Sequence, residues 1–225
     1  MRVVLSWSSG KDSAWALSVL RGTPGVEVVG LLSTVNEAAG RVAMHGVRRT
    51  LLAQQAAAVG LPMHEVGLPW PCDNATYEDR VGAALAAARA AGVDAIAFGD
   101  LFLADVRAYR EAQLARAGLH GLFPLWGQPT GPLAAEMLRA GLRARLSCID
   151  TRVVPATLAG AAFDDALLQS LPEGTDPLGE NGEFHTFCTW APGFARPVDV
   201  EAGAVHTDGA FTFTDLIPVG DGAHG

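Results

Sequence analysis

Residues 2–13 read Arg-Val-Val-Leu-Ser-Trp-Ser-Ser-Gly-Lys-Asp-Ser. The first five are mostly apolar, which is typical of a buried strand, and a cluster of Ser and Gly separates them from a periodic stretch. We therefore expect a strand over 2–6, a loop, and a helix over 12–20. This strand–loop–helix unit is the first step of a parallel α/β sheet.

The same alternation continues as far as residue 117. The apolar runs predict further strands at 26–32, 63–66 and 95–98, and the periodic stretches predict helices at 47–59, 77–91 and 105–117. Strands that alternate with helices of this length indicate an α/β fold, with a parallel sheet covered by helices on both faces.

Beyond the last of these helices the chain changes character, because residues 123–132 are dense in turn-forming Gly and Pro. We place a domain boundary there, between an ATP-binding domain at 1–125 and a smaller α+β, substrate-binding domain at 126–225. In the second domain we expect helices at 133–140 and 163–171, a strand at 145–149, a glycine-rich loop at 174–183 and a hairpin near 210–213.

Composition excludes several classes of protein. The 16 Lys and Arg residues against 24 Asp and Glu give a net charge of −8, which argues against a nucleic-acid partner. Cys72, Cys148 and Cys188 form no CxxC pair, so we expect buried or half-buried thiols and neither disulfides nor a zinc or iron–sulfur site. The apolar run at the start is too short for a signal peptide or a spanning helix, which predicts a cytoplasmic protein without a membrane partner.

The loop after the first strand is a candidate anion site. Free N–H groups and the helix dipole at a helix start favour an anion, and hydroxyls at Ser8, Ser9 and Ser13 add donors. Gly10 allows phosphate to approach the backbone closely. The alternative is an ordinary Ser/Asp helix cap.

The spacing excludes the two commonest phosphate loops. A Walker loop needs a glycine where Leu5 stands, and it needs Ser or Thr where Asp12 stands. No GxGxxG pattern follows the strand either.

Residues 8–13 resemble the Ser-Gly-Gly-Lys-Asp-Ser signature of the PP-loop ATP pyrophosphatases, with Ser9 in place of the first glycine. Proteins of that superfamily have a Rossmann-like (HUP-type) sheet and split ATP between its α and β phosphates. Residues 98–111 with 123–127, and above all residues 176–186, resemble the diphthine–ammonia ligase family. The resemblance runs from residue 3 to about residue 200, with its motifs in the same order.

This resemblance implies an ATP-dependent carbon–nitrogen ligase. In the family, ATP adenylates a carboxylate and releases pyrophosphate, and ammonia then displaces AMP to leave an amide. The implied cofactors and partners are ATP, Mg²⁺, ammonia and a carboxylate, which is protein-borne diphthine in archaea or eukaryotes and an unknown acid in bacteria. The sequence is also compatible with a homodimer.

The resemblance and the topology together indicate the nucleotide-binding residues. Lys11 is expected to contact the phosphates, and Asp12 to hold Mg²⁺ through oxygen. Residues that end a strand lie at the carboxyl edge of the sheet, where ligands of open α/β folds bind. The full expected set is Ser6, Ser8, Ser9, Gly10, Lys11, Asp12, Ser13, Ser33, Thr34, His45, Gly99 and Asp100. For Asp100 the alternative is a helix cap or turn, and for His45 it is a solvated side chain.

Residues 179–186 read Gly-Glu-Asn-Gly-Glu-Phe-His-Thr and form the second cluster. Glu180 and Glu183 are candidates to orient ammonia or bind a metal, and His185 to shuttle a proton, so with Lys11 and Asp12 they form the expected catalytic set. The alternative is a surface turn. The expected substrate-binding residues are Arg107, Glu111, Asn181, Gly182 and Thr186.

Three features of the sequence leave the identity of the carboxylate substrate open. Arg107 and Glu111, spaced i and i+4 on one helix, can also be a plain surface ion pair. Leu178 replaces a cysteine that we associate with this position in relatives, and residues 160–163 lack the basic residue expected after the glycine.

Two other functions compete with the ligase. One is tRNA modification by thiolation or lysidine formation, against which stand the acidic balance and the lack of a convincing pair of reactive cysteines. The other is an ATP-binding sensor without turnover, which has no need of a second, carboxylate-rich segment.

Overall fold

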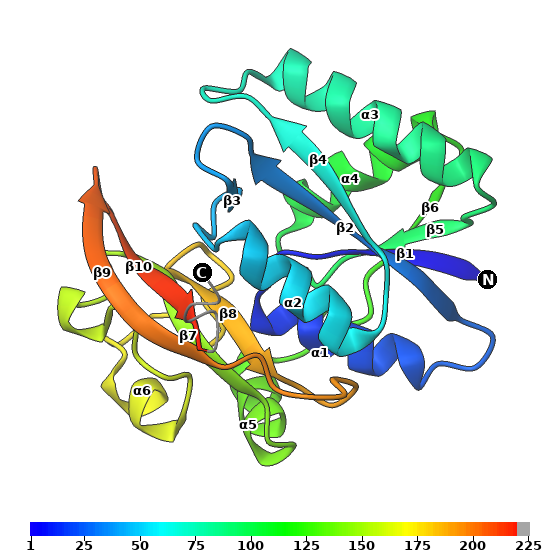
Figure 1. Cartoon of the computed structure of the whole chain (residues 1–225). Coiled ribbons are helices and arrows are strands. Elements are labelled where there is room, and N and C mark those ends of the chain that lie inside the picture. Colours follow the sequence, from blue (N-terminus) through cyan, green and yellow to red (C-terminus); the bar gives the residue numbers. More distant parts are fainter. Residues whose placement is uncertain (220–225) are drawn as a thin grey trace.

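The computed structural model describes residues 1–219 and contains two sheets (Figure 1). The first sheet is built from β1 (Arg2–Ser6), β2 (Glu27–Asn36), β3 (Arg41–Val42), β4 (Met63–Leu68), β5 (Ala95–Ala97) and β6 (His120–Leu122). Its helices are α1 (Lys11–Arg21), α2 (Arg49–Val59), α3 (Asn74–Ala90) and α4 (Ala104–Arg116).

The second sheet is antiparallel, in the order β8-β7-β10-β9. Its strands are β7 (Arg143–Asp150), β8 (Phe184–Trp190), β9 (Val200–Asp208) and β10 (Phe211–Pro218). The remaining elements are α5 (Thr130–Arg139), the 3₁₀ turn η1 (Ala156–Leu158) and α6 (Asp165–Ser170).

The first sheet is parallel apart from the short strand β3. Strand β1 pairs with β2 on one side and with β5 on the other; β4 extends the sheet beyond β2, and β6 extends it beyond β5. Strand β3 pairs antiparallel with the end of β2. The chain thus moves outward from β1 in one direction and then in the other, which creates a topological switch point between β1 and β5.

Alternate side chains of the central strands enter two separate cores. Val3 and Leu5 pack with α1 and α2, whereas Val4 packs with α3 and α4. Figure 1 shows these two helix pairs on opposite sides of the sheet. The predicted α/β fold with helices on both faces is therefore confirmed, as is the additional α+β part.

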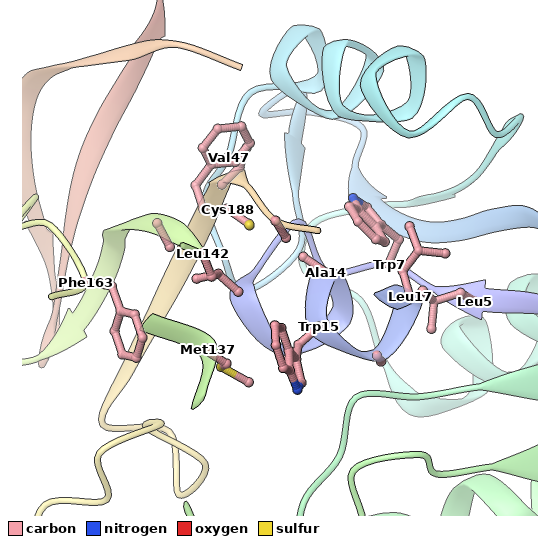
Figure 2. Close-up of a cluster of buried hydrophobic side chains, with 14 of the residues drawn as sticks. Leu5, Trp7, Ala14, Trp15, Leu17, Val47, Met137, Leu142, Phe163 and Cys188 are labelled. Atoms are coloured by element: carbon pink, nitrogen blue, oxygen red, sulfur yellow. The ribbon is translucent and has the colours of Figure 1, made fainter. Parts of the chain in front are cut away.

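The second sheet lies on the α1 side and shares its core. One apolar cluster runs from β1 and α1 into α5, β7 and β8. Figure 2 shows Trp15 of α1, Met137 of α5 and Cys188 of β8 within it. Because this core is continuous, the boundary between residues 125 and 126 stays a prediction, and residues 220–225 of the predicted second domain lie outside the described residues.

Several elements differ from the prediction at their ends. Helix α3 begins at Asn74 rather than at residue 77, because the Asp73 carboxylate accepts the N–H of Thr76 at 2.7 Å and caps the helix earlier. Strand β2 extends to Asn36, since β4 pairs with it over Leu31–Asn36. Strands β3, β6 and β8 were not predicted: the first two have only two or three residues, and β8 contains the buried polar side chain of Thr186 beside His185.

Gln55 of α2 ties the two sheets together. Its side chain is fully buried, its Oε1 accepts the indole N–H of Trp7 at 2.8 Å, and its Nε2 donates to the carbonyls of Ser9 at 3.0 Å and Cys188 at 2.6 Å. Three segments distant in sequence therefore meet at one amide.

Among the described residues, no helix is long and apolar enough to span a bilayer.

We predict that Gln55→Ala lowers the free energy of unfolding by roughly 2–4 kcal/mol, because it leaves several buried polar groups without partners. Gln54→Ala, the same change one residue earlier on a half-buried position, is the matched control. Urea denaturation of both variants measures the effect, and equal destabilisation would show that the Gln55 amide has no such role.

Candidate functional site

The candidate site lies at the switch point, at the carboxyl ends of β1 and β5. The segment after β5 packs closely on the first turn of α1, because a Cβ placed on Gly99 would lie 2.9 Å from the Asp12 carbonyl carbon and 3.0 Å from the Ser13 nitrogen. Only glycine allows this approach without a shift. The position expected for Gly99 and Asp100, at the carboxyl edge beside the loop of residues 7–10, is thus where the structure brings them.

Ser9 has a left-handed backbone, with φ +70°. This is the position at which the resembled signature carries glycine, and a non-glycine residue there costs roughly 1–2 kcal/mol. The Ser9 carbonyl accepts two hydrogen bonds, from Gln55 Nε2 and from the N–H of Cys188 at 2.8 Å. These bonds from α2 and β8 hold the strained residue in place.

The polar groups of the loop divide into those already bonded and those without a partner. Ser8 Oγ accepts the Gly10 N–H at 3.3 Å, and the Ser13 hydroxyl donates to the Gly10 carbonyl at 3.0 Å. Within residues 1–219, three buried side-chain oxygens have no hydrogen-bond partner near this edge of the sheet: Ser9 Oγ, Asp12 Oδ1 and Ser33 Oγ. Buried polar atoms without partners are rare, and here they are available to a ligand.

Lys11 is the only lysine of the chain and its side chain is almost fully buried. Its Nζ donates to Asp12 Oδ2 at 2.9 Å and to the carbonyl of Leu178. The ammonium also lies 5.6 Å from the ring centre of Phe163 and 5.3 Å from that of Phe184. Residues 7–13, here called the phosphate loop, and the segment of residues 178–184 therefore both contact the Lys11 ammonium.

Residues 174–183, here called the carboxylate loop, are shaped by two of their own acids. Glu183 is buried and accepts the N–H groups of Asp176 at 3.0 Å and Asn181 at 2.9 Å, and also the Asn181 side chain at 3.0 Å. The Asp176 carboxylate accepts the N–H of Glu180 at 2.8 Å. Glu183 and Asn181 thus bond to one another, and Gly182 between them has φ +89°.

Glu180 reaches out of this loop across the site. Its Oε1 accepts the N–H of Leu101, just after β5, at 2.7 Å. Burial raises the pKa of Glu180 to about 7; the Leu101 N–H opposes the shift, and the charges of Asp12 and Asp100 add to it. Burial is also the main reason that the pKa of Asp12 is raised, against the lowering effect of Lys11.

The rings of His45 and His185 lie against each other beside the phosphate loop, with ring centres 4.6 Å apart and the ring planes tilted by 38°. Burial is the main reason that the pKa of His45 is lowered well below 6.5 and that of His185 to about 4, and the charge of Lys11 contributes to both shifts. His45 Nδ1 lies 3.2 Å from the Thr186 carbonyl, so in the neutral ring Nδ1 carries the proton and Nε2 is a free acceptor. Both imidazoles are therefore neutral bases near pH 7.

Thr186 caps helix α1, since its Oγ1 accepts the N–H of Lys11 at 3.1 Å. This residue was expected to bind substrate, and here its hydroxyl holds the start of α1.

Two of the expected nucleotide-binding residues lie at the ends of strands. Ser6 ends β1, where it pairs with Leu32, and the Thr34 carbonyl, near the end of β2, accepts the N–H of Ala43 at 3.0 Å.

Arg107 and Glu111 form the i, i+4 ion pair at 2.8 Å, with both side chains partly exposed. The guanidinium of Arg107 also stacks on Phe123 at 4.6 Å and on Trp126 at 4.7 Å. In this arrangement the contacts of Arg107 are with aromatic rings and Glu111 rather than with the phosphate loop.

Sequence reasoning missed Gln55, Asp176 and Arg110. Arg110 Nε lies 2.6 Å from Asp100 Oδ2, so it is Arg110 that pairs with the acid expected at the nucleotide. A signal existed for Gln55, because it is a polar residue on the apolar face of α2. The Arg110 pairing has no such signal, because the same helix also presents Arg107 at a similar spacing.

The residues present fit a magnesium nucleotide better than a metal held by the protein alone. Within residues 1–219, no three His, Cys, Asp or Glu side chains converge on a point where they could hold a metal. Mg²⁺ commonly binds to one or two carboxylates together with substrate phosphates. Asp12, with Oδ1 free, offers the carboxylate for such a site.

The fold and this loop define the class: an α/β protein with a PP-loop at the switch point, where the carboxyl end of β1 leads into the start of α1. Residues 1–120 match the family model of the diphthamide synthase N-terminal domain. This is more than half of the 225 residues, so the chain belongs to that family, and the predicted resemblance is confirmed. The family lies among the PP-loop ATP pyrophosphatases, which use ATP. A comparison with curated proteins finds no match.

We predict that Ser9→Gly raises the free energy of unfolding by up to about 1 kcal/mol, because the strain that glycine relieves is only partly offset by its greater freedom in the unfolded chain. Ser9→Val, which places a β-branched side chain at positive φ, lowers it by roughly 1–3 kcal/mol. Thermal and urea unfolding compare the two, and a valine variant as stable as the glycine variant contradicts the strained geometry.

The pKa of Glu180 predicts a pH dependence of stability. Between pH 4.5, its ordinary pKa, and about 7, the folded protein holds a proton that the unfolded chain has released. The contribution of this group to stability is therefore complete below pH 4.5 and is lost as the pH rises through about 7.

Glu180→Gln keeps an acceptor for the Leu101 N–H but cannot ionise. We expect the stability of this variant relative to wild type to rise between about pH 5 and pH 8. Urea titrations at several pH values measure it, with Glu173→Gln at an exposed position of the same region as control. A difference that is flat with pH contradicts the raised pKa.

Proposed function

We propose that this protein is an ATP-dependent ligase that adenylates a carboxylate and forms an amide with ammonia, like the diphthine–ammonia ligases. The observation that supports the proposal most directly is the position of Lys11. Its ammonium contacts Asp12 of the phosphate loop and Leu178 of the carboxylate loop, so groups suited to ATP and groups suited to an acceptor surround one charge.

On the nucleotide side, the phosphates of ATP bind at the start of α1. The loop offers the unpartnered Oγ of Ser9 for polar contact, and the neighbouring strand β2 offers that of Ser33. Lys11 exchanges its bond to Leu178 for a phosphate oxygen, so its charge follows the pyrophosphate as that group leaves. Asp12 Oδ1 would hold Mg²⁺, which neutralises charge on the phosphates when bound.

On the acceptor side, Glu180 is the candidate base that accepts a proton. Ammonia attacks the carbonyl carbon of the acyl adenylate, the bond to AMP breaks, and the nitrogen must lose one proton. A carboxylate with a pKa of about 7 is matched to this transfer near neutral pH. His185, neutral and beside His45, is the second candidate base.

In this proposal Glu183 has a supporting role. Its carboxylate accepts three hydrogen bonds within the carboxylate loop, which leaves it little capacity for ammonia or metal. Loss of Glu183 acts through Glu180 and Leu178, whose positions depend on the shape of this loop.

The two buried cysteines weigh against tRNA thiolation. Burial raises the pKa of Cys148 to about 12 and that of Cys188 further still, so neither forms the thiolate that sulfur transfer requires. Sulfur incorporation into tRNA, with Cys72→Ala and Cys188→Ala as controls, tests this rival directly.

The decisive experiment is pyrophosphate release with ATP, ammonium and a library of carboxylic acids. We expect release with one class of acid, which includes protein-borne diphthine if the source is archaeal or eukaryotic. Lys11→Ala should lower the rate about 100-fold or more, because one electrostatic contact to the transition state is lost. Glu183→Ala should also lower it, and Lys11→Arg, which keeps the charge, is the control.

Tight ATP binding without pyrophosphate release, for every acid tried, favours the sensor function instead. Full activity of Lys11→Ala contradicts the proposed role of the lysine.

A further inference from the structure

His45, which lies against the phosphate loop, belongs to a short turn between two elements. Residues 41–48 comprise the two-residue strand β3 and the turn that leads to α2. Met44 and Gly46 both have left-handed backbones, with φ +64° and +66°. Arg48 is the N-cap of α2, yet the helix start has no side-chain cap. Backbone hydrogen bonds from the Val42 N–H to the Val47 carbonyl at 2.7 Å and from the Gly46 N–H to the Val42 carbonyl at 3.1 Å close the turn on itself. These local bonds do not reach the second sheet.

The opposite end of the chain supplies the anchor. Asp215 of β10 accepts Arg41 Nη2 and Arg48 Nε on Oδ1, both at 2.9 Å, and Arg48 Nη2 on Oδ2 at 2.5 Å. We call these three residues the Asp215 clasp. The Phe213 ring lies against Gly46, where an added Cβ would be only 2.8 Å from it.

Asp215 lies where the ladder between β9 and β10 is irregular. Thr214 pairs with Val205 and Leu216 with Ala202, so two residues of β9 oppose the single residue Asp215. This is a bulge in β9, opposite Asp215. The side chain of Asp215 is 15% exposed, and its pKa is lowered to about 2, chiefly by the hydrogen bonds from Arg48.

The Asp215 clasp holds the turn whose His45 contacts the phosphate loop. A Cβ on Gly10 would lie 3.2 Å from His45 Cε1, so the imidazole covers the glycine. Arg41 Nη1 donates to the Gly46 carbonyl at 2.7 Å, which fixes the residue next to His45 directly. The path from Asp215 to Gly10 thus consists of consecutive contacts.

We propose that Asp215 is a positioning residue of the nucleotide site: through Arg41 and Arg48 it holds His45 on the phosphate loop, so the C-terminal sheet takes part in ATP binding. The proposal rests on the ATP-binding function proposed above. The proposed role belongs to a residue of β10, which lies outside the 120 residues that match the family model.

The test uses Asp215→Asn in the full chain, with two measurements. The first is the Kd for ATP with Mg²⁺ by calorimetry, which we expect to rise about tenfold. The second is the NMR titration of the His45 ring, assigned with His45→Gln. We expect its pKa to rise toward 6.5 as the ring leaves His185 and Lys11, the titratable groups that face it. Asp215→Glu should recover part of both effects.

Arg152→Ala is the matched control, because it breaks the ion pair of Arg152 with Asp150 on the neighbouring strand without touching residues 41–48. It should leave both measurements unchanged. If Asp215→Asn does not fold, Arg48→Gln, which keeps the pair between Arg41 and Asp215, takes its place in the same two measurements.

A folded variant with the wild-type Kd and the wild-type His45 titration overturns the proposal. Failure of the proposed function is a separate result, namely that wild type binds no ATP. The titration of His45 decides on the clasp in that case too, because it needs no nucleotide.

Discussion

The Ser9 carbonyl accepts hydrogen bonds from α2 and from β8, and the Thr186 hydroxyl, also on β8, accepts the first N–H of α1. Through these contacts the backbone of the phosphate loop is hydrogen-bonded directly to the second sheet. The loop can keep a strained left-handed residue because partners distant in sequence hold it. Removal of the second sheet would leave the start of α1 without its cap and the Ser9 carbonyl without one of its donors.

The charges of the site follow from this docking. When β8 lies on the phosphate loop, the preceding carboxylate loop covers Lys11 and brings Glu180 to the end of β5. One ammonium then lies among several acids, and burial disfavours the ionised form of those that it does not neutralise. The raised pKa of Glu180 and the neutral histidines are consequences of the same closure. In the proposed function, a nucleotide would exchange with these internal contacts rather than fill an empty surface.

Local patterns were enough to predict most of the first sheet. Alternation in residues 2–6 and the helical period after Lys11 depend on near neighbours alone, and the carboxyl-edge rule then placed Gly99 beside the loop. Strand β8 was missed because His185 and Thr186 are polar, and their burial depends on what packs against them. The Asp215 clasp was missed for a similar reason, since an acid in a C-terminal hairpin has no sequence pattern that names its partners.

The sequence by itself determined the parallel α/β sheet, the position of the phosphate loop and, through its motifs, the family, because these depend on periodicity and on residue types at fixed spacing. Only the tertiary structure decided what each polar residue of the site does. Glu183 shapes its loop while Glu180 crosses the site, and Arg110 rather than Arg107 pairs with Asp100. The physical reason is that hydrogen bonds and pKa shifts depend on distances and burial between segments, which spacing along the chain does not fix.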